Sequence, residues 1–208
     1  MSAPAIALAN QALRLLAAEQ IESLDEGTEQ ANTVVQVYPT TVACLLSAHP
    51  WRFTLRKAQL ARLADPPLTE WPHQHAVPAD MLTLRTLFAG AGSRTPVRDY
   101  EIFERRVLSA QEELWADYQC SPDAGRFPPW FANLARTALA ADLAIPVGVG
   151  TERADYFRRI AFGSPAEGGN GGLMQVARRV DSQQAPPQRI TDFPLITARF
   201  GGRAGSAG

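Results

Sequence analysis

Apolar residues recur three and four positions apart through the first fifty residues. This spacing predicts a helix from about Pro4 to Ala18, with Ser2 as its N-terminal cap. A second apolar face predicts a helix that takes Asp25 as its cap and ends at Ala48. Because Pro39 has no backbone N–H, we expect the second helix to be kinked or split after Tyr38.

The middle third of the chain changes to strand-like patterns. Residues 53–63 predict either a strand or a continuation of the helix, and the run 81–88, rich in Leu, Thr and Phe, predicts a strand. Residues 100–103 and 107–108 predict a hairpin. Alternation over 114–120 predicts one more strand. Together these segments predict a small antiparallel β unit inserted in a helical protein.

Helical spacing returns after Pro128 and predicts helices over 130–144, 151–162 and 173–184. We expect Tyr156, Phe157 and Ile160 to anchor the middle one. The glycine run 168–172 is expected to be a flexible break. The predicted fold class is therefore α+β, mainly α-helical. A bundle made of residues 1–50 and 128–184 receives a β-rich insertion, residues 51–127, and an extended flexible tail follows, residues 185–208.

Composition and charge narrow the range of functions. Of the 208 residues, 46% are hydrophobic and 20% are charged, and the formal net charge is −1. A chain of this kind is typical of a globular protein and has no basic field to attract nucleic acid or an acidic membrane. The charge is uneven, because acids gather in 19–29 and basic residues in 52–62. We expect these segments to be two complementary faces of a subunit that stacks against a copy or a partner.

The cysteines and the apolar runs bear on the compartment. Cys44 and Cys120 form no CxxC motif, which favours a reducing cytoplasm. No apolar stretch approaches the roughly 20 residues that cross a bilayer. The first twenty residues lack the basic start of a signal peptide, so we interpret them as an ordinary helix. The sequence thus predicts no membrane association.

No segment carries a recognisable catalytic or cofactor motif. His73 and His75, with Asp80 downstream, are a weak metal signal, and we favour a solvated loop between Trp71 and Pro78. The glycine run is not followed by the Lys-Ser or Lys-Thr that a phosphate-binding loop needs. We predict no catalytic residues, no metal and no cofactor. An enzyme with a site assembled only in the fold is the third reading, and no motif supports it.

Aromatic and large apolar residues provide the remaining signal. We expect most of the four tryptophans to be core anchors. The C-terminal tail is different, because it carries bulky apolar residues beside Pro and Gly. These are candidate partner-binding residues: Ile190, Phe193, Leu195, Ile196 and Phe200. Simple packing of these residues on the chain's own core is the open alternative.

Several stretches, taken in order, resemble one family. They are the I-x-S-L-D-E passage at 21–26, Tyr38-Pro39, the run LLSAHPWRF at 45–53, V-P-A-D-M-L at 77–82, the hairpin at 100–102, the strand at 114–118 and the helix at 129–144. Over roughly residues 20–160 the chain resembles the tail tubular protein A family of short-tailed phages. Relatives of that family are head-to-tail adaptors in other tailed phages and in gene transfer agents.

The resemblance implies a virion protein of the neck, assembled in the host cytoplasm. It implies a ring, of twelve copies, that docks under the portal protein and contacts the next tail or nozzle protein below. Genomic DNA would pass through the lumen without sequence-specific binding, and no catalytic residue or cofactor is implied. The chain departs from the expected pattern at Phe103-Glu104-Arg105, where we expect a glycine at the hairpin turn. The resemblance covers the tail from Pro187 onward poorly.

A second function class remains open. Local arginines and four tryptophans would also suit a small DNA-binding or packaging accessory protein. The net charge of −1 counts against it, because clustered basic charge dominates phosphate binding. A salt-dependent DNA-binding measurement separates the two classes.

Overall fold

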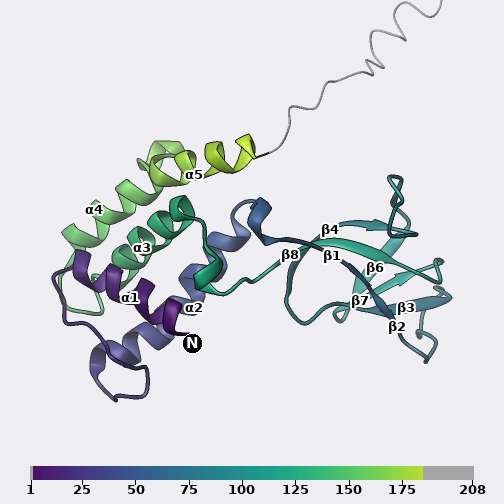
Figure 1. Ribbon diagram of the computed structural model, residues 1–208, viewed down its shortest axis with the longest axis horizontal. Coiled ribbons are helices and arrows are strands. Elements are labelled where there is room, and N and C mark those ends of the chain that lie inside the picture. Colours follow the sequence, from purple (N-terminus) through teal and green to yellow (C-terminus); the bar gives the residue numbers. More distant parts are fainter. Residues whose placement is uncertain (1, 185–208) are drawn as a thin grey trace, which may run out of the picture.

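Five helices form one lobe of the protein, seen at one end of Figure 1, a ribbon view of a computed structural model. The structure describes residues 2–184. Within them the helices are α1 (Ala3–Leu15), α2 (Glu29–Ser47), α3 (Pro129–Leu143), α4 (Thr151–Phe162) and α5 (Gly172–Gln183). None of these helices is long and apolar enough to cross a membrane.

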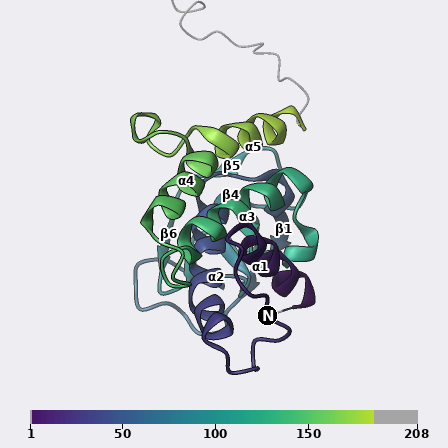
Figure 2. The same ribbon diagram turned by 90° about the vertical axis from the view of Figure 1, so that its left-hand side faces the viewer.

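The central position of α3 explains its composition. It contacts each of the other four helices, and the end-on view in Figure 2 shows it in the middle of the lobe. It is therefore buried on more than one face, including Phe131, Leu134, Ala138 and Leu143. Its alanines allow close approach of the neighbouring helices, and its proline lies in the first turn, where no hydrogen bond is lost.

The predicted helices are confirmed, with three corrections. The cap of α2 is Thr28, whose hydroxyl accepts from Ala31 N at 3.2 Å, and not Asp25, which lies in the preceding turn. Of the two alternatives at Pro39, the split is wrong, because α2 continues to Ser47, and the kink stays a prediction. Ser2 occupies the cap position of α1, but its side chain makes no capping hydrogen bond.

Two four-stranded antiparallel sheets form the other lobe. The strands are β1 (Leu55–Gln59), β2 (Ala61–Arg62), β3 (His73–Ala76), β4 (Met81–Phe88), β5 (Pro96–Val97), β6 (Tyr100–Phe103), β7 (Arg106–Ser109) and β8 (Trp115–Cys120). One sheet has the order β1-β8-β4-β5 and the other β2-β3-β7-β6. The predicted α+β class is confirmed, and the strands of residues 2–184 all fall between the two groups of helices.

The β lobe has a much smaller apolar core than the helical lobe. Its buried cluster is Leu60, Leu87, Val107, Leu114, Ala116, Tyr118 and Cys120. Several strands bury little of their surface, and β6 leaves three of its four residues exposed. The lobe therefore holds its shape with short strands and polar contacts as much as with apolar burial.

Buried polar side chains within β3 correct one prediction. Residues 71–78 are not a solvated loop, because β3 pairs with both β2 and β7. His75 is completely buried, and its Nε2 lies 3.1 Å from the carbonyl oxygen of Glu112, so Nε2 must be the protonated nitrogen. The Gln74 amide donates to Asp65 O at 2.7 Å. The Gln74 amide and His75 Nε2 thus have partners outside the strand, whereas His75 Nδ1 has no hydrogen-bond partner within residues 2–184. Local polarity was misleading because contacts outside the strand allow these polar residues to be buried.

Two expectations about aromatic residues are wrong. Only Trp51 of the four tryptophans is fully buried; the other three are partly exposed. In α4, Phe157 packs in the core, but Tyr156 is 55% exposed and Ile160 is 37% exposed. The outer face of α4 therefore presents apolar surface to solvent.

Candidate partner-binding surfaces

A rigid joint sets how the two lobes present their surfaces. Trp51 precedes the 3-10 turn Arg52–Thr54 that leads into β1, and it is buried in the core of the helical lobe. It packs edge-on against Phe131 with ring centroids 5.2 Å apart, and its Nε1 donates to Leu45 O at 2.8 Å. The range 51–127 expected for the β unit thus begins with a residue of the helical core.

Polar groups of β8 and α5 contact the same joint. The amide of Gln119, on β8, is buried and donates to His49 O at 2.9 Å and to Thr54 Oγ1 at 3.3 Å. The carboxylate of Asp181, on α5, is 2% exposed and accepts from Arg52 N at 2.9 Å. Because each contact joins residues at least 65 positions apart, the joint forms only when both lobes and α5 are in place.

His49 is the titratable group at this joint. Its Nε2 lies 3.5 Å from Asp181 Oδ2. Burial is the largest influence and lowers the pKa of His49, Arg178 lowers it further, and the attraction of Asp181 opposes both. Near neutral pH the imidazole is therefore held mainly in its neutral form.

The helical lobe carries a groove. It consists of two adjoining hollows with volumes of about 720 and 380 Å³, which share Phe162 and Gly169. Asp155, Arg158, Arg159, Ser164 and Pro165 line the first hollow, and Cys44, Leu45, Asp142, Met174 and Arg178 line the second. We call this surface the α4 groove.

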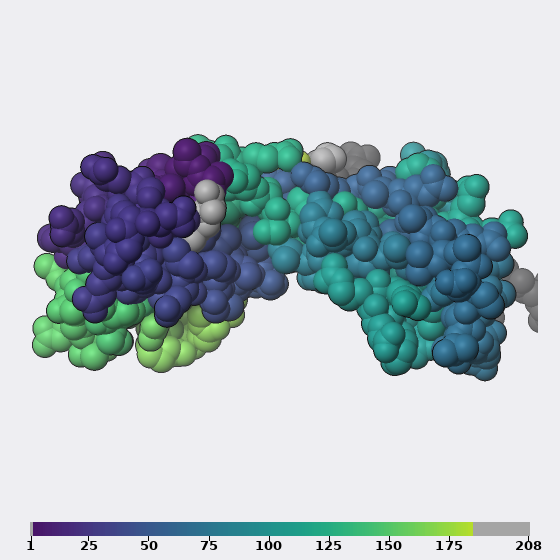
Figure 3. Space-filling view, turned by 90° about the horizontal axis from the view of Figure 1, so that it is seen from below, coloured from purple at the N-terminus to yellow at the C-terminus, as the bar shows by residue number. Residues whose placement is uncertain are grey.

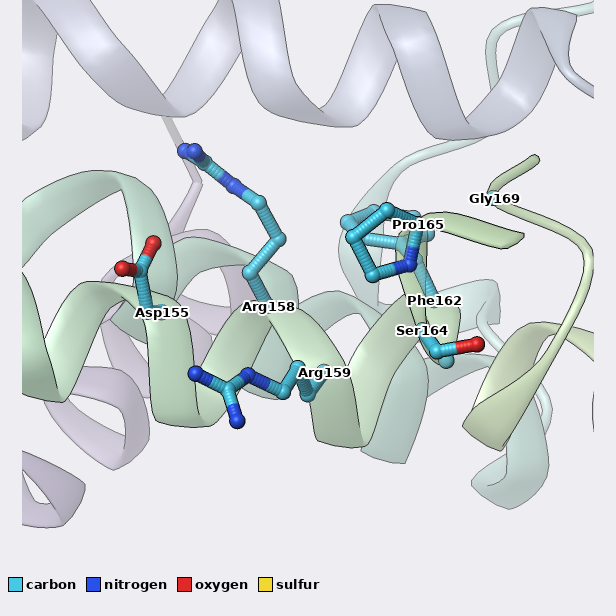
Figure 4. A pocket seen from close by; sticks show the side chains of 8 residues that line it. Asp155, Arg158, Arg159, Phe162, Ser164, Pro165 and Gly169 are labelled. Carbon is cyan, nitrogen blue, oxygen red and sulfur yellow. The ribbon is translucent and has the colours of Figure 1, made fainter. Parts of the chain in front are cut away.

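The two α4 arginines that line the groove differ in whether they have an ion-pair partner. Arg158 pairs with Asp142 at 3.3 Å, whereas Arg159 has no hydrogen-bond or ion-pair partner within residues 2–184. Figure 4 shows the two arginines leaving α4 in different directions, with Phe162 and Pro165 farther along the hollow. The groove thus combines apolar lining with one cation that is available to a partner.

The glycine-rich segment 168–172 borders this groove and packs around the carboxylate of Glu167. Glu167 accepts from Ser164 N at 2.6 Å and from Ser164 Oγ at 2.9 Å. These bonds lower the pKa of Glu167. A Cβ at Gly171 would lie 2.4 Å from the same carboxylate. The glycines therefore make room for an internal acid, in agreement with the rejection of a phosphate-binding motif.

The tip of the β6–β7 hairpin exposes two large apolar residues. Ile102 is 49% exposed and Phe103 is 55% exposed. The register pairs Phe103 with Arg106, which leaves Glu104 and Arg105 as a two-residue turn. Both turn residues have positive φ, 47° and 59°, the conformation that favours Asn-Gly in such turns. We call Ile102 to Arg105 the hairpin tip.

The two turn residues differ in what they contact. Arg105 packs back on its own lobe: its guanidinium donates to Pro78 O at 3.4 Å, and its carbonyl accepts from Val77 N at 3.2 Å. Glu104 is exposed and makes no side-chain hydrogen bond or ion pair within the described chain. An L-residue in this backbone conformation costs roughly 1–2 kcal/mol. Sequence analysis noted the absent glycine but did not identify the exposed tip.

The basic residues of 52–62, which we expected to form a binding face, are mostly paired with acids. Arg56 pairs with Asp80 at 2.6 Å, Lys57 Nζ lies 3.2 Å from Asp117, and Arg62 lies 3.5 Å from Glu112. These pairs are on exposed strands, where their net energies are small. Three of the four basic residues in 52–62 therefore have acidic partners in their own lobe.

The acidic segment has a different organisation. Its residues lie in the loop between α1 and α2 and at the start of α2, at the far end of the helical lobe. Glu26 accepts from the backbone N–H groups of Glu22 and Ser23 and from the Thr28 hydroxyl, and these bonds lower its pKa. The acids thus order their own loop, and the remaining ones face solvent.

Other sequence-predicted sites are placed as follows. The tail residues Ile190, Phe193, Leu195, Ile196 and Phe200 lie outside the described residues. His73 and His75 share a strand, but residues 2–184 contain no group of three or more His, Cys, Asp or Glu side chains arranged to hold a metal ion. Cys44 is exposed in the α4 groove, and Cys120 is buried in the β lobe.

Comparison with known proteins gives no family for this chain. No protein-family model matches it, and no curated protein matches it. The surfaces of the chain itself are therefore the basis for proposing a function.

Proposed function

We propose that this chain is a structural virion subunit, a head-to-tail adaptor that forms a ring under the portal and connects the capsid to the tail. The observation that carries the proposal is a pair of unlike exposed surfaces, the hairpin tip and the α4 groove, on two lobes held by a buried polar joint. A ring needs two different complementary faces on each subunit, held at a fixed angle.

The shape of the molecule suits this role. The space-filling view in Figure 3 shows two lobes with the surface hollowed between them. Such an elongated subunit can contact a ring above with one part and the next tail component with another. In the proposed assembly, twelve copies match a twelve-subunit portal, and genomic DNA passes through the lumen without sequence-specific contacts.

The tail is the proposed portal contact. Its apolar residues, Ile190, Phe193, Leu195, Ile196 and Phe200, would each contribute roughly 1.5–3 kcal/mol if buried. Ordering the backbone costs about 1–2 kcal/mol per residue, so a partner groove or free strand edge is needed to make docking favourable. Removing residues 185–208 should leave the melting temperature nearly unchanged while weakening portal binding by orders of magnitude.

Electron microscopy of negatively stained mixtures tests the proposal. The full chain mixed with the portal protein of the same virion should add a second ring to portal particles, while the chain alone should sediment as a monomer at micromolar concentration. Portal particles that remain unchanged at saturating chain would overturn the proposal. A truncated chain that binds portal as well as the full chain would remove only the tail from the account.

The charge distribution disfavours the DNA-binding alternative. The basic segment after Trp51 is engaged in ion pairs with Asp80, Asp117 and Glu112, so few cations there are available to phosphates.

A further inference from the structure

The hairpin tip exposes apolar side chains that a turn does not need, which is typical of a binding surface. It exposes Ile102 and Phe103 next to each other, at the end of an edge strand. For comparison, β1, an edge strand of the other sheet, carries Arg56 and Lys57, and charged edges of this kind resist pairing with other chains. The tip carries only Glu104 as an unengaged charge, in a backbone conformation that glycine or asparagine would adopt more easily.

The α4 groove offers complementary chemistry. Phe162 is partly exposed in it and Pro165 is exposed, whereas Leu45 and Met174, which also line it, are only 2% exposed. Arg159 stands at the first hollow without a partner in the described chain. The first hollow is lined by the acidic Asp155 as well as by Arg159, so the match is between the exposed Phe103 and Glu104 of the tip and the part of the groove formed by Phe162 and Arg159.

We propose that the hairpin tip of one copy inserts into the α4 groove of the next copy, with Phe103 over Phe162 and Glu104 beside Arg159. This inference rests on the proposed ring function and names its subunit contact. The two partners lie on different lobes, so the contact is head-to-tail, and a pair of bound copies leaves one tip and one groove free. Repeated contacts of this type close into a ring or continue as a filament.

The same observations explain why the contact is weak between free copies. A hairpin tip buries far less surface than the roughly 1,200–2,000 Å² of a stable interface. An exposed Glu–Arg pair contributes little free energy and mainly sets orientation. A template that gathers copies raises their effective concentration, so the ring forms on its partner and not in dilute solution.

Cysteine cross-linking tests the contact, because Cys44 already lies exposed in the groove. The variant Phe103→Cys, at millimolar concentration with a short bismaleimide, should give a ladder of dimers, trimers and larger products linked from position 103 to Cys44. Leu68→Cys is the matched control, since Leu68 is a fully exposed apolar residue of the same lobe. It should cross-link at least tenfold more slowly.

Two further experiments test whether the tip of one copy binds the groove of another. Phe103→Cys combined with Cys44→Ser carries only the reactive tip, and mixing it with the unmodified chain, which carries only the reactive groove, should give dimers and no larger products. Charge exchange gives an independent readout: Glu104→Arg or Arg159→Glu alone should slow cross-linking about fivefold, and the two together should restore it.

Each result decides between the claims. Cross-linking no faster than the Leu68→Cys control, or products joined at other sites, overturns the inference. If portal particles still gain a ring while the 103–44 link is absent from it, the proposed function stands and this contact is wrong. If the ladder forms but portal particles gain nothing, the self-contact stands and the adaptor proposal fails.

Discussion

The helical lobe and the β lobe differ in the size of their apolar cores. The helical lobe buries a large apolar cluster around α3, whereas the β lobe has a small core and leaves apolar residues exposed at the tip of β6. Proteins commonly place binding residues on less stable segments that a rigid scaffold positions. The difference indicates that substitutions in the core of the helical lobe should change folding, whereas those at the hairpin tip, and at its proposed partner Arg159, should change assembly.

The largest loss of stability is expected at the joint between the lobes. Trp51→Ala removes a fully buried side chain from the helical core together with its hydrogen bond to Leu45 O. The free energy of unfolding, measured by urea denaturation, should fall by about 3–5 kcal/mol. Trp130→Ala is the control, because Trp130 is only partly buried; an equal loss there would mean that Trp51 has no special role.

A smaller loss is expected when α5 loses its contact with the joint. Asp181→Ala leaves the Arg52 N–H, now in a partly buried hydrogen bond, without its acceptor, which should cost about 1–3 kcal/mol. Asp181→Asn keeps an acceptor oxygen and should lose less. If the alanine variant is as stable as the parent chain, the buried carboxylate does not secure the joint.

A substitution in the hairpin turn should increase the stability of the protein. Replacing Glu104-Arg105 by Asn-Gly relieves two left-handed non-glycine residues and should stabilise the β lobe by about 1 kcal/mol. The same variant should cross-link more slowly, because the acid that faces Arg159 is gone. A loss of stability, measured by thermal melting, would show that the contact of Arg105 with Pro78 matters more than the backbone conformation.

The smallest effect concerns pH. Because the pKa of His49 is lowered in the folded protein, the unfolded chain binds the proton more readily. The contribution of His49 to stability is therefore complete above the unfolded pKa, near 6.5, and is lost as the pH falls below that value. Denaturation curves between pH 7 and pH 5 should show this decline in the parent chain and a shallower one in His49→Gln; identical slopes would contradict the assignment.

Local patterns predicted most of the fold. Period-3.6 apolar spacing, proline at helix starts and glycine at breaks located the helices, and alternation located β8. Asp25 and Thr28 are both good capping residues, and only the path of the loop selects Thr28. The strand His73–Ala76 was missed because its polar residues are buried through contacts outside the strand: the Gln74 amide donates to Asp65 O, and His75 Nε2 donates to Glu112 O.

The binding surfaces were less accessible to sequence reasoning. The joint depends on Gln119 and Asp181, whose partners are at least 65 residues away. The exposed face of α4 was read as core because Tyr156 and Ile160 have the spacing of buried residues. At the hairpin tip, the missing glycine was a real signal, but its meaning required the backbone conformation and the exposure of Phe103.

The central claim is that this chain assembles as a ring on a portal. Native mass spectrometry of the full chain, mixed in excess with the portal ring of the same virion, tests it most directly. The account predicts one dominant complex with twelve copies of the chain on a twelve-subunit portal and few partial occupancies, because neighbouring copies reinforce one another. A portal ring that carries no copies, or one or two at random, would contradict it.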